Sequence, residues 1–216
     1  MKRLVFLLVA AASLVLGLAL GSGCKTEATP APTASAASPT SATTATPSGK
    51  QEVAILAGGC FWGMEDLLRK IPGVLDTDVG YSGGALAEPT YEDVKKGTTG
   101  HAESVRVVFD PAVLSYEDLL AKWFFRMHDP TTKNRQGNDI GSQYRSAIFV
   151  TSEEQRRVAQ EVKKRIDATG KWDGPIVTEI VDAGPFTRAE DYHHDYLQER
   201  PNGYTCHYLR DWGESI

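Results

Sequence analysis

Two consecutive glycines, Gly58 and Gly59, stand between a short apolar run and an amphipathic segment. The run 53–57 is uniformly apolar, which predicts a buried strand, and residues 64–71 carry apolar side chains at helical spacing. Glycine has no Cβ and therefore permits the tight turn that such a strand-to-helix junction requires. The sequence thus predicts a strand that turns sharply into a helix.

Cys60 follows the two glycines directly and begins the predicted helix. A thiol at a helix N-terminus faces unpaired backbone N–H groups and the positive end of the helix dipole, which favour the thiolate. Cys60 is therefore a candidate nucleophile, and Phe61 and Trp62 offer an apolar surface beside it. The alternative is a buried structural cysteine packed with two core aromatic residues.

The first residues have the composition of a targeting segment. Lys2 and Arg3 precede an uncharged apolar stretch that ends in small residues before Cys24, which predicts a signal peptide over residues 1–23. A membrane-spanning anchor is the alternative. The pattern also resembles a bacterial lipoprotein signal with Cys24 as the lipidated residue, although Gly21 stands where such signals usually carry Leu. We expect an exported protein of the periplasm or cell envelope, either anchored by a lipid on Cys24 or cleaved without lipidation.

Residues 24–50 contain mainly Ala, Thr, Ser and Pro, which predicts a disordered tether. The remaining residues 51–216 suit one domain with a single core. Without the two signal-peptide cations, Lys2 and Arg3, the formal net charge of −5 becomes −7. A mildly acidic domain without a basic cluster is not expected to bind nucleic acid.

The domain combines predicted strands with predicted helices. The strand-like runs are Glu52–Ala57, Val74–Gly80, Glu103–Phe109, Ser146–Val150 and Ile176–Val181. Helices are expected after Ser115, after Thr151 with an end at Gly170, and from Thr187 to Pro201, where residues of capping type precede apolar positions. This order predicts an α+β fold in which helices cover a mixed sheet.

The segment after Pro201 is rich in Gly and Tyr and lacks periodicity, which predicts a mobile loop. It carries Cys206, the only cysteine of the domain besides Cys60. In an exported protein, two cysteines can form a structural disulfide. They can equally be a redox pair.

Several short motifs follow one another through the domain. They are Gly59-Cys60-Phe61-Trp62-Gly63, Gly80-Tyr81-Ser82-Gly83-Gly84, Pro89-Thr90-Tyr91, Gly100-His101-Ala102-Glu103-Ser104-Val105, His128-Asp129-Pro130-Thr131, Gln136-Gly137-Asn138-Asp139-Ile140-Gly141-Ser142-Gln143-Tyr144-Arg145-Ser146 and Ala189-Glu190-Asp191-Tyr192-His193. Together they resemble the peptide methionine sulfoxide reductases of the A type. The resemblance implies a two-layer α/β sandwich with a ferredoxin-like core, a monomer, and no metal or bound organic cofactor. It also implies reduction of the S epimer of methionine sulfoxide in proteins and peptides.

The same resemblance implies that Cys60 is the nucleophile, that Phe61 and Trp62 hold the substrate methyl group, and that Glu103 donates a proton. Glu103 lies in a predicted strand, where an inward-facing carboxyl would be poorly hydrated. Desolvation raises a carboxyl pKa, so such a group can act as an acid near neutral pH. The alternative is an exposed strand glutamate paired with Arg106 or with a lysine.

Three further residues match the family's substrate-binding positions. Tyr91 and Tyr144 match two tyrosines whose hydroxyls hydrogen-bond the sulfoxide oxygen, a task suited to donors that carry no charge. Half-buried structural tyrosines are the alternative. Asp139 matches an acidic residue that orders the substrate backbone, and the alternative is a turn residue beside Gly137.

The segment around Cys206 resembles that of family members with a single resolving cysteine. The implied relay begins with a sulfenic acid on Cys60, which condenses with Cys206 to a disulfide. A thioredoxin-like protein or a small dithiol then reopens the disulfide. A permanent structural bridge is the competing interpretation, and it would block the nucleophile.

Other features point to rival functions. Glu190 and His194 share a helical face, but a metal site needs more ligands than these. His101 is a candidate base for Cys60 in a hydrolase of the Cys–His class. A third alternative is a non-catalytic lipoprotein that binds partners through exposed aromatic residues.

Overall fold

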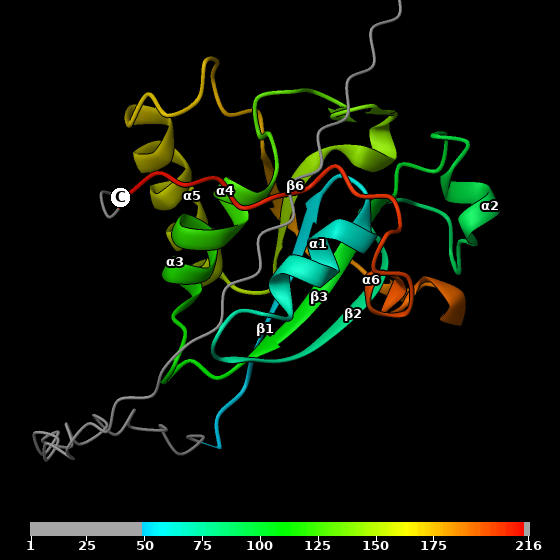
Figure 1. Cartoon of the computed structure of the whole chain (residues 1–216), viewed down its shortest axis with the longest axis horizontal. Helices are drawn as coiled ribbons and strands as arrows, with labels where there is room; N and C mark the ends of the chain where they lie inside the picture. Colours follow the sequence, from blue (N-terminus) through cyan, green and yellow to red (C-terminus); the bar gives the residue numbers. More distant parts are fainter. Residues whose placement is uncertain (1–48, 214–216) are drawn as a thin grey trace, which may run out of the picture. The chain divides into compact units, whose positions relative to one another are not determined.

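The computed structural model describes residues 49–213. Its centre is a six-stranded mixed sheet in the order β7-β6-β1-β3-β2-β8 (Figure 1). Neighbouring strands pair antiparallel except β6 and β7, which are parallel. The strands of this sheet are β1 (Glu52–Gly58), β2 (Val74–Ser82), β3 (Ala102–Phe109), β6 (Ser146–Val150), β7 (Glu179–Asp182) and β8 (Thr187–Arg188).

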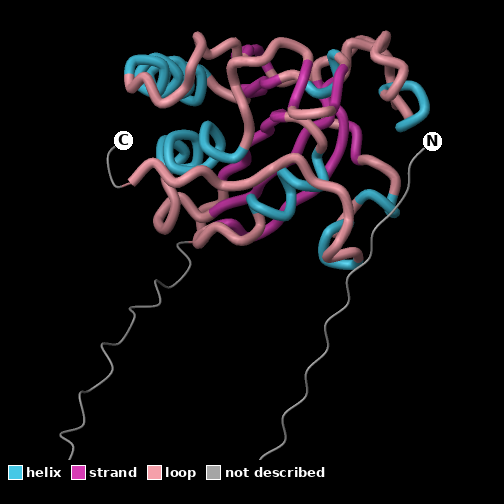
Figure 2. The backbone as a smooth tube through the Cα atoms, turned by 45° about the horizontal axis from the view of Figure 1, so that its top comes forward, coloured by secondary structure: helices cyan, strands magenta, loops and turns pink. Residues whose placement is uncertain are grey.

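The connections between these strands carry the helices and a small ribbon (Figure 2). The ribbon consists of β4 (Arg135–Gln136) and β5 (Asp139–Ile140). The α-helices are α1 (Phe61–Leu68), α2 (Tyr91–Val94), α3 (Tyr116–Asp118), α4 (Phe125–Met127), α5 (Glu153–Ala168) and α6 (Tyr196–Glu199). The tighter or wider helical turns are the π-helical η1 (Leu119–Phe124) and the 3-10 segments η2 (Ser142–Tyr144) and η3 (Asp191–His193).

The main hydrophobic core lies between the sheet and helices α1, η1 and α5. On β1, Ala54 and Leu56 belong to this core, whereas Ile55 and Ala57 belong to a smaller cluster that includes Phe149 of β6. Alternate residues of a strand point to opposite faces, so the two clusters lie on the two faces of the sheet. The sheet is therefore buried on both sides, which explains why the sequences of β1 and β6 are almost continuously apolar.

Helix α1 lies across β1 and β3 and directs Met64 and Leu68 into the main core (Figure 1). Met64 is fully buried, as is Met127 of α4. The apolar residues whose spacing predicted this helix therefore form the face that packs on the sheet.

Most of the expected elements are confirmed. The predicted N-cap Ser115 accepts a hydrogen bond from the backbone of Asp118, and Ser152 accepts one from Gln155 at the start of α5. Gly170 follows α5 with φ of +64°, the left-handed conformation expected of a glycine that ends a helix. The strand expected over 176–181 begins later, at Glu179, because the backbone N–H of Val177 donates to Pro130 outside the sheet.

The helix expected from Thr187 to Pro201 is wrong. Thr187 and Arg188 form β8 and pair with β2, and only the short η3 and α6 follow within this stretch. Glu190, which follows Thr187 at the spacing of a capping box, accepts hydrogen bonds from the hydroxyl of Tyr81 and the backbone of Tyr91. Contacts with distant strands therefore override the local capping pattern.

The predicted signal peptide over residues 1–23, the lipidation of Cys24 and the tether up to residue 48 lie outside the described residues. Between residues 49 and 213, the structure contains no helix with the length and apolar character needed to cross a membrane.

Candidate active site

The junction between β1 and α1 has the predicted tight turn. Gly59 has φ of +105°, and a Cβ at this position would lie 2.5 Å from Cγ of Gln136. At Gly58, a Cβ would lie 2.9 Å from the buried ring of His128. Gly59 is therefore needed for the turn and for packing, whereas Gly58 is needed for packing. The residue that follows them, Cys60, occupies the N-cap of α1, as the sequence predicts.

A cavity of about 140 Å³ opens at this junction. Its lining residues are Cys60, Phe61, Trp62, Tyr91, Glu103, Asp139, Tyr144 and Tyr204. The structure thus brings together every substrate-contacting residue expected from the sequence, from α1, α2, β3, β5 and η2. Tyr204 is an addition that the sequence did not predict.

Glu103 lies on β3 with only 3% of its surface exposed, and it faces the start of α1. Its carboxyl oxygen Oε2 accepts a hydrogen bond from the backbone N–H of Phe61 at 3.1 Å. Burial raises the pKa of Glu103 to about 8, against the lowering effect of the Phe61 N–H and with a further rise from Asp139. The carboxyl is therefore mainly protonated at neutral pH and can act as an acid.

The alternative of an exposed glutamate paired with Arg106 is excluded by the positions of both side chains. Glu103 is buried, whereas Arg106 forms an ion pair with Asp78 of the neighbouring strand β2. The two residues lie an odd number of positions apart on β3, so their side chains point to opposite faces of the sheet.

The expectation that Cys60 rests as a thiolate is wrong, although its place at the helix N-terminus is confirmed. Only 6% of the residue is exposed, and burial raises its pKa far above the ordinary value for a thiol. The neighbouring Glu103 raises the pKa further, while the backbone N–H of Trp62 lowers it. Burial outweighs the helix terminus, so Cys60 rests as a neutral thiol.

Tyr91 and Tyr144 present two phenol groups to the cavity. Burial raises the pKa of each hydroxyl above its usual value, and the nearby Glu103 adds to the effect once it is ionised. Both side chains are therefore neutral hydrogen-bond donors at physiological pH. Donors of this kind can stabilise negative charge that develops on an oxygen atom.

Asp139 connects the cavity to the segment that carries the second cysteine. Its carboxylate accepts a hydrogen bond from the hydroxyl of Tyr204 at 3.0 Å and one from the thiol of Cys206 at 3.4 Å. Asp139 itself lines the cavity. The signal that could have pointed to Tyr204 is its position two residues before a candidate redox cysteine.

Residues 204–207, called here the C-terminal strap, lie along α1. His207 Nε2 is 2.8 Å from the carbonyl oxygen of Gly58. A Cβ on Gly63 would lie 2.3 Å from Oγ1 of Thr205, so the strap fits only over a glycine. Cys206 thus belongs to a segment without regular structure, as expected, and that segment lies against the junction of β1 and α1 that carries Cys60. The two sulfurs are separate thiols in this structure.

His101 is not among the residues that line the cavity. Its ring packs against Gly84, where a Cβ would lie 2.0 Å from Nδ1, and burial lowers its pKa. The dyad of Cys60 and His101 that a hydrolase needs is therefore not assembled.

The acidic and histidine-rich run that begins at Glu190 has structural partners. Besides the two hydrogen bonds to Glu190, His194 Nε2 lies 3.1 Å from the carbonyl oxygen of Ala189. Over residues 49–213, no group of three or more His, Cys, Asp or Glu side chains is arranged to hold a metal ion.

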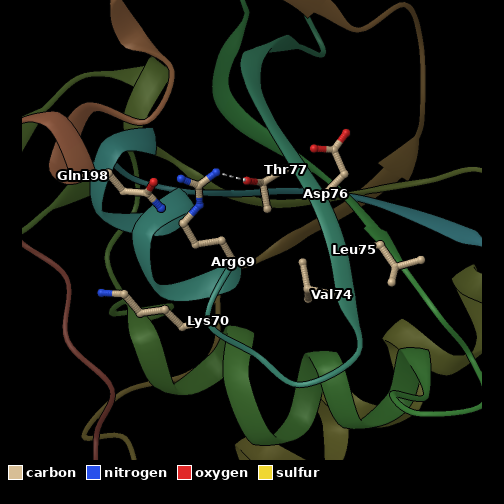
Figure 3. Close-up of a pocket in the computed structure, with 7 residues that line it drawn as sticks. All are labelled: Arg69, Lys70, Val74, Leu75, Asp76, Thr77 and Gln198. Atoms are coloured by element: carbon tan, nitrogen blue, oxygen red, sulfur yellow. Dashed lines mark hydrogen bonds between the residues drawn. The ribbon is translucent and has the colours of Figure 1, made fainter. Parts of the chain in front are cut away.

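A larger hollow of about 300 Å³ lies at the other end of α1, beside β2 (Figure 3). Its lining residues are Arg69, Lys70, Val74, Leu75, Asp76, Thr77 and Gln198. Its cations are already paired, Arg69 with Asp195 and Lys70 with Asp66. With no nucleophilic sulfur and no free cation, this hollow is not the reaction site.

Comparison with known proteins agrees with the geometry of the cavity. The family model described as "Peptide methionine sulfoxide reductase" matches residues 52–215. The chain is 58% identical to the peptide methionine sulfoxide reductase MsrA 1 of Mesorhizobium japonicum over 159 residues, which are 74% of this chain and 90% of the relative.

Solved structures give the same result. Mxr1 from Saccharomyces cerevisiae in reduced form superposes with a TM-score of 0.71 at 38% identity, over 75% of this chain and 93% of Mxr1. The structure of Mxr1 in complex with Trx2 superposes with a TM-score of 0.51 at 28% identity, over 76% of this chain and 93% of Mxr1.

Proposed function

This chain belongs to the peptide methionine sulfoxide reductase family, and we propose that it reduces the S epimer of methionine sulfoxide by attack of Cys60. The observation that carries the proposal is the convergence of the Cys60 thiol, the buried carboxylic acid of Glu103 and the phenols of Tyr91 and Tyr144 on a single cavity. The thiol supplies electrons, and the other groups can supply protons and hydrogen bonds to an oxygen atom.

In the first step, Cys60 Sγ attacks the sulfoxide sulfur while the sulfoxide oxygen is protonated. Glu103 gives its proton to the oxygen and recovers one from the Cys60 thiol, so the carboxyl ends the step as it began. The oxygen is transferred to Cys60, which becomes a sulfenic acid. Cys60 loses two electrons, the substrate sulfur gains them, and methionine leaves.

The remaining cavity residues bind and orient the substrate. Tyr91 and Tyr144 donate hydrogen bonds to the sulfoxide oxygen as charge develops on it. Phe61 and Trp62 form an apolar wall for the substrate methyl group, called here the methyl slot. Asp139 accepts hydrogen bonds from the substrate backbone.

In the second step, the thiol of Cys206 attacks the sulfenic acid of Cys60, a disulfide forms and water leaves. A thioredoxin-like protein or a small dithiol reduces this disulfide by thiol–disulfide exchange. The contact of the C-terminal strap with the end of β1, two residues before Cys60, supports this step, and so does the solved complex of Mxr1 with Trx2. The substrates are oxidised proteins and peptides, and no bound cofactor takes part.

Mass spectrometry of the enzyme after one equivalent of a peptide methionine S-sulfoxide tests both steps. The unmodified protein should form the Cys60–Cys206 disulfide and release one equivalent of methionine. Cys60→Ser should release none, whereas Cys206→Ser should release one equivalent and retain a sulfenic acid on Cys60. Methionine release by Cys60→Ser rejects the nucleophile. Repeated turnover of Cys206→Ser with thioredoxin alone rejects the resolving role.

We also propose that the protein is exported and anchored to a membrane by a lipid on Cys24. The support is the order of basic, apolar and small residues before Cys24. The N-terminal peptide of protein purified from bacterial membranes should begin at Cys24 and carry acyl chains, and Cys24→Ser should release the protein from the membrane fraction. An N-terminal peptide without acyl chains would reject the anchor.

A ferredoxin-like description of the fold is likewise a proposal. Strands β6, β1, β3 and β2 are neighbours in that order, and α1 connects β1 to β2 while α3, η1 and α4 lie between β3 and β6. This βαββαβ order supports the description. We further propose that the enzyme acts as a monomer, since one chain supplies every cavity residue. A mass of two chains in light scattering of the purified enzyme would reject the monomer.

A further inference from the structure

The indole of Trp62 is fixed in the methyl slot by two contacts on its outer side. Its Nε1–H donates a hydrogen bond to Nδ1 of His193 at 3.1 Å. Its ring also stacks on Tyr196 of α6, with 3.8 Å between ring centroids and 11° between planes. The stack alone permits the indole to rotate within its plane, whereas the hydrogen bond defines one orientation.

His193 lies directly behind the cavity without lining it. The residue is 1% exposed. Its ring centroid is 5.0 Å from that of Phe61 and 4.6 Å from that of Tyr91, both of which line the cavity. It therefore touches three cavity residues while remaining out of reach of the substrate.

The hydrogen bond with Trp62 requires a neutral histidine. An indole N–H only donates, so Nδ1 of His193 must be the acceptor and the ring proton must be on Nε2. Burial lowers the pKa of His193 and thereby favours this uncharged form. Glu190 Oε2 is 4.0 Å from Nε2, beyond hydrogen-bond distance, and it accepts instead from the hydroxyl of Tyr81.

We propose that His193 is a positioning residue that holds the in-plane orientation of the Trp62 indole and thereby sets the selectivity of the methyl slot for methyl over larger alkyl sulfoxides. The proposal rests on the proposed function. If the hydrogen bond is lost, the indole can rotate within its plane. The edge of the ring that bounds the methyl slot can then move aside, and a longer alkyl group fits. Discrimination of a single methylene in a rigid apolar pocket is about 10- to 200-fold, and a slot with a mobile wall loses most of it.

Two amide substitutions distinguish the role of His193 as a hydrogen-bond acceptor from its role in packing. The amide of Asn occupies the place of Nδ1, whereas the amide of Gln occupies the place of Nε2. His193→Asn should therefore keep an acceptor for Trp62, and His193→Gln should not. Selectivity is measured as the ratio of kcat/KM for N-acetylmethionine sulfoxide to kcat/KM for N-acetylethionine sulfoxide. His193→Gln should lose about tenfold in selectivity, the size expected for one lost hydrogen bond, while His193→Asn should stay within about threefold of the unmodified enzyme.

A double-mutant cycle tests whether His193 acts through Trp62. In Trp62→Phe the N–H donor is absent, so adding His193→Gln should change the selectivity little. The indole N–H signal of Trp62 in a ¹H–¹⁵N spectrum should also move upfield in His193→Gln and not in His193→Asn. His194→Gln removes the neighbouring histidine, which does not contact Trp62, and should leave both readouts unchanged.

Equal loss of selectivity from His193→Gln in the unmodified and Trp62→Phe backgrounds would overturn the proposal. So would a Trp62 signal that does not shift, or parental selectivity in a His193→Gln enzyme that folds. If His193→Gln does not fold, His193→Asn decides the question. A selectivity below a tenth of the parental value in His193→Asn would then overturn the proposal. An unmodified enzyme that reduces neither sulfoxide rejects the proposed function itself, which is a different result.

Discussion

The thiol of Cys206 donates a hydrogen bond to the carboxylate of Asp139, with 3.4 Å between Sγ and Oδ2. Burial and the charge of Asp139 together raise the pKa of Cys206 to about 12. The second cysteine is therefore held close to the cavity but kept as an unreactive thiol. A peptide substrate that takes the hydrogen-bonding capacity of Asp139 would release that thiol for the second step.

Asp139→Asn should make Cys206 more reactive towards alkylating reagents. Removing the carboxylate charge lowers the pKa of the thiol, because a nearby negative charge disfavours the thiolate. The measurement is the rate of iodoacetamide labelling at pH 8 in a Cys60→Ser background, followed on the Cys206 peptide by mass spectrometry. An unchanged or slower rate at Cys206 would show that burial alone sets its reactivity.

The reductase step should slow as pH rises through about 8. Glu103 is protonated below its raised pKa of about 8 and loses its proton above it, so the acid is absent at higher pH. The plot of log kcat/KM for a peptide sulfoxide should fall above pH 8 in the unmodified enzyme. Glu103→Gln should be slower by about 10²-fold or more and should lack this falling limb. A falling limb that persists in Glu103→Gln would assign it to another group.

The same carboxyl should make the fold less stable as pH increases. The pKa of Glu103 in the folded protein is about 8, against an ordinary value of 4.5, so between these pH values the folded state binds more protons than the unfolded state. The free energy of unfolding therefore falls as pH rises through that window. Between pH 5 and pH 8, the melting temperature of Glu103→Gln should decrease by several degrees less than that of the unmodified protein. Parallel decreases in the two proteins would contradict the buried acid.

Gly63→Ala should impair disulfide formation much more than methionine release. Alanine in a helix usually stabilises by about 1 kcal/mol relative to glycine. Here, however, its Cβ would lie 2.3 Å from Thr205 Oγ1 and 2.6 Å from His207 Nδ1, so the C-terminal strap must move. In a single-turnover reaction, the rate of Cys60–Cys206 disulfide formation should fall at least about tenfold, since a small misplacement of reacting groups can cost 10²-fold.

Gly184→Ala is the control for this substitution, because a Cβ at Gly184 meets no atom within 4 Å. It should form the disulfide at the parental rate. A Gly63→Ala enzyme that does the same would show that the strap does not have to lie on α1 during resolution.

Local patterns predicted the elements that depend on local interactions. The glycines before Cys60, the serine cap at Ser115 and the helix-ending Gly170 act within a few residues, and the structure has them as expected. The helix expected from Thr187 failed because Glu190 is bound by Tyr81, 109 positions away in the chain. A capping pattern carries no information about such a partner.

The parts of the site that the sequence did not reveal depend on long-range contacts or on burial. Tyr204 reaches Asp139 across 65 positions, and His193 reaches Trp62 across 131. The protonation of Cys60 could not be predicted either, since a helix terminus is visible in a sequence whereas the depth at which it is buried is not.

Met64 and Met127 are both fully enclosed by the core, and they are the methionines that residues 49–213 contain. Oxidants dissolved in water reach a thioether only at the surface or when the chain opens. The thioethers of these two residues are therefore protected from oxidation in the folded protein, so that residues 49–213 present no methionine sulfoxide to a second copy of the enzyme.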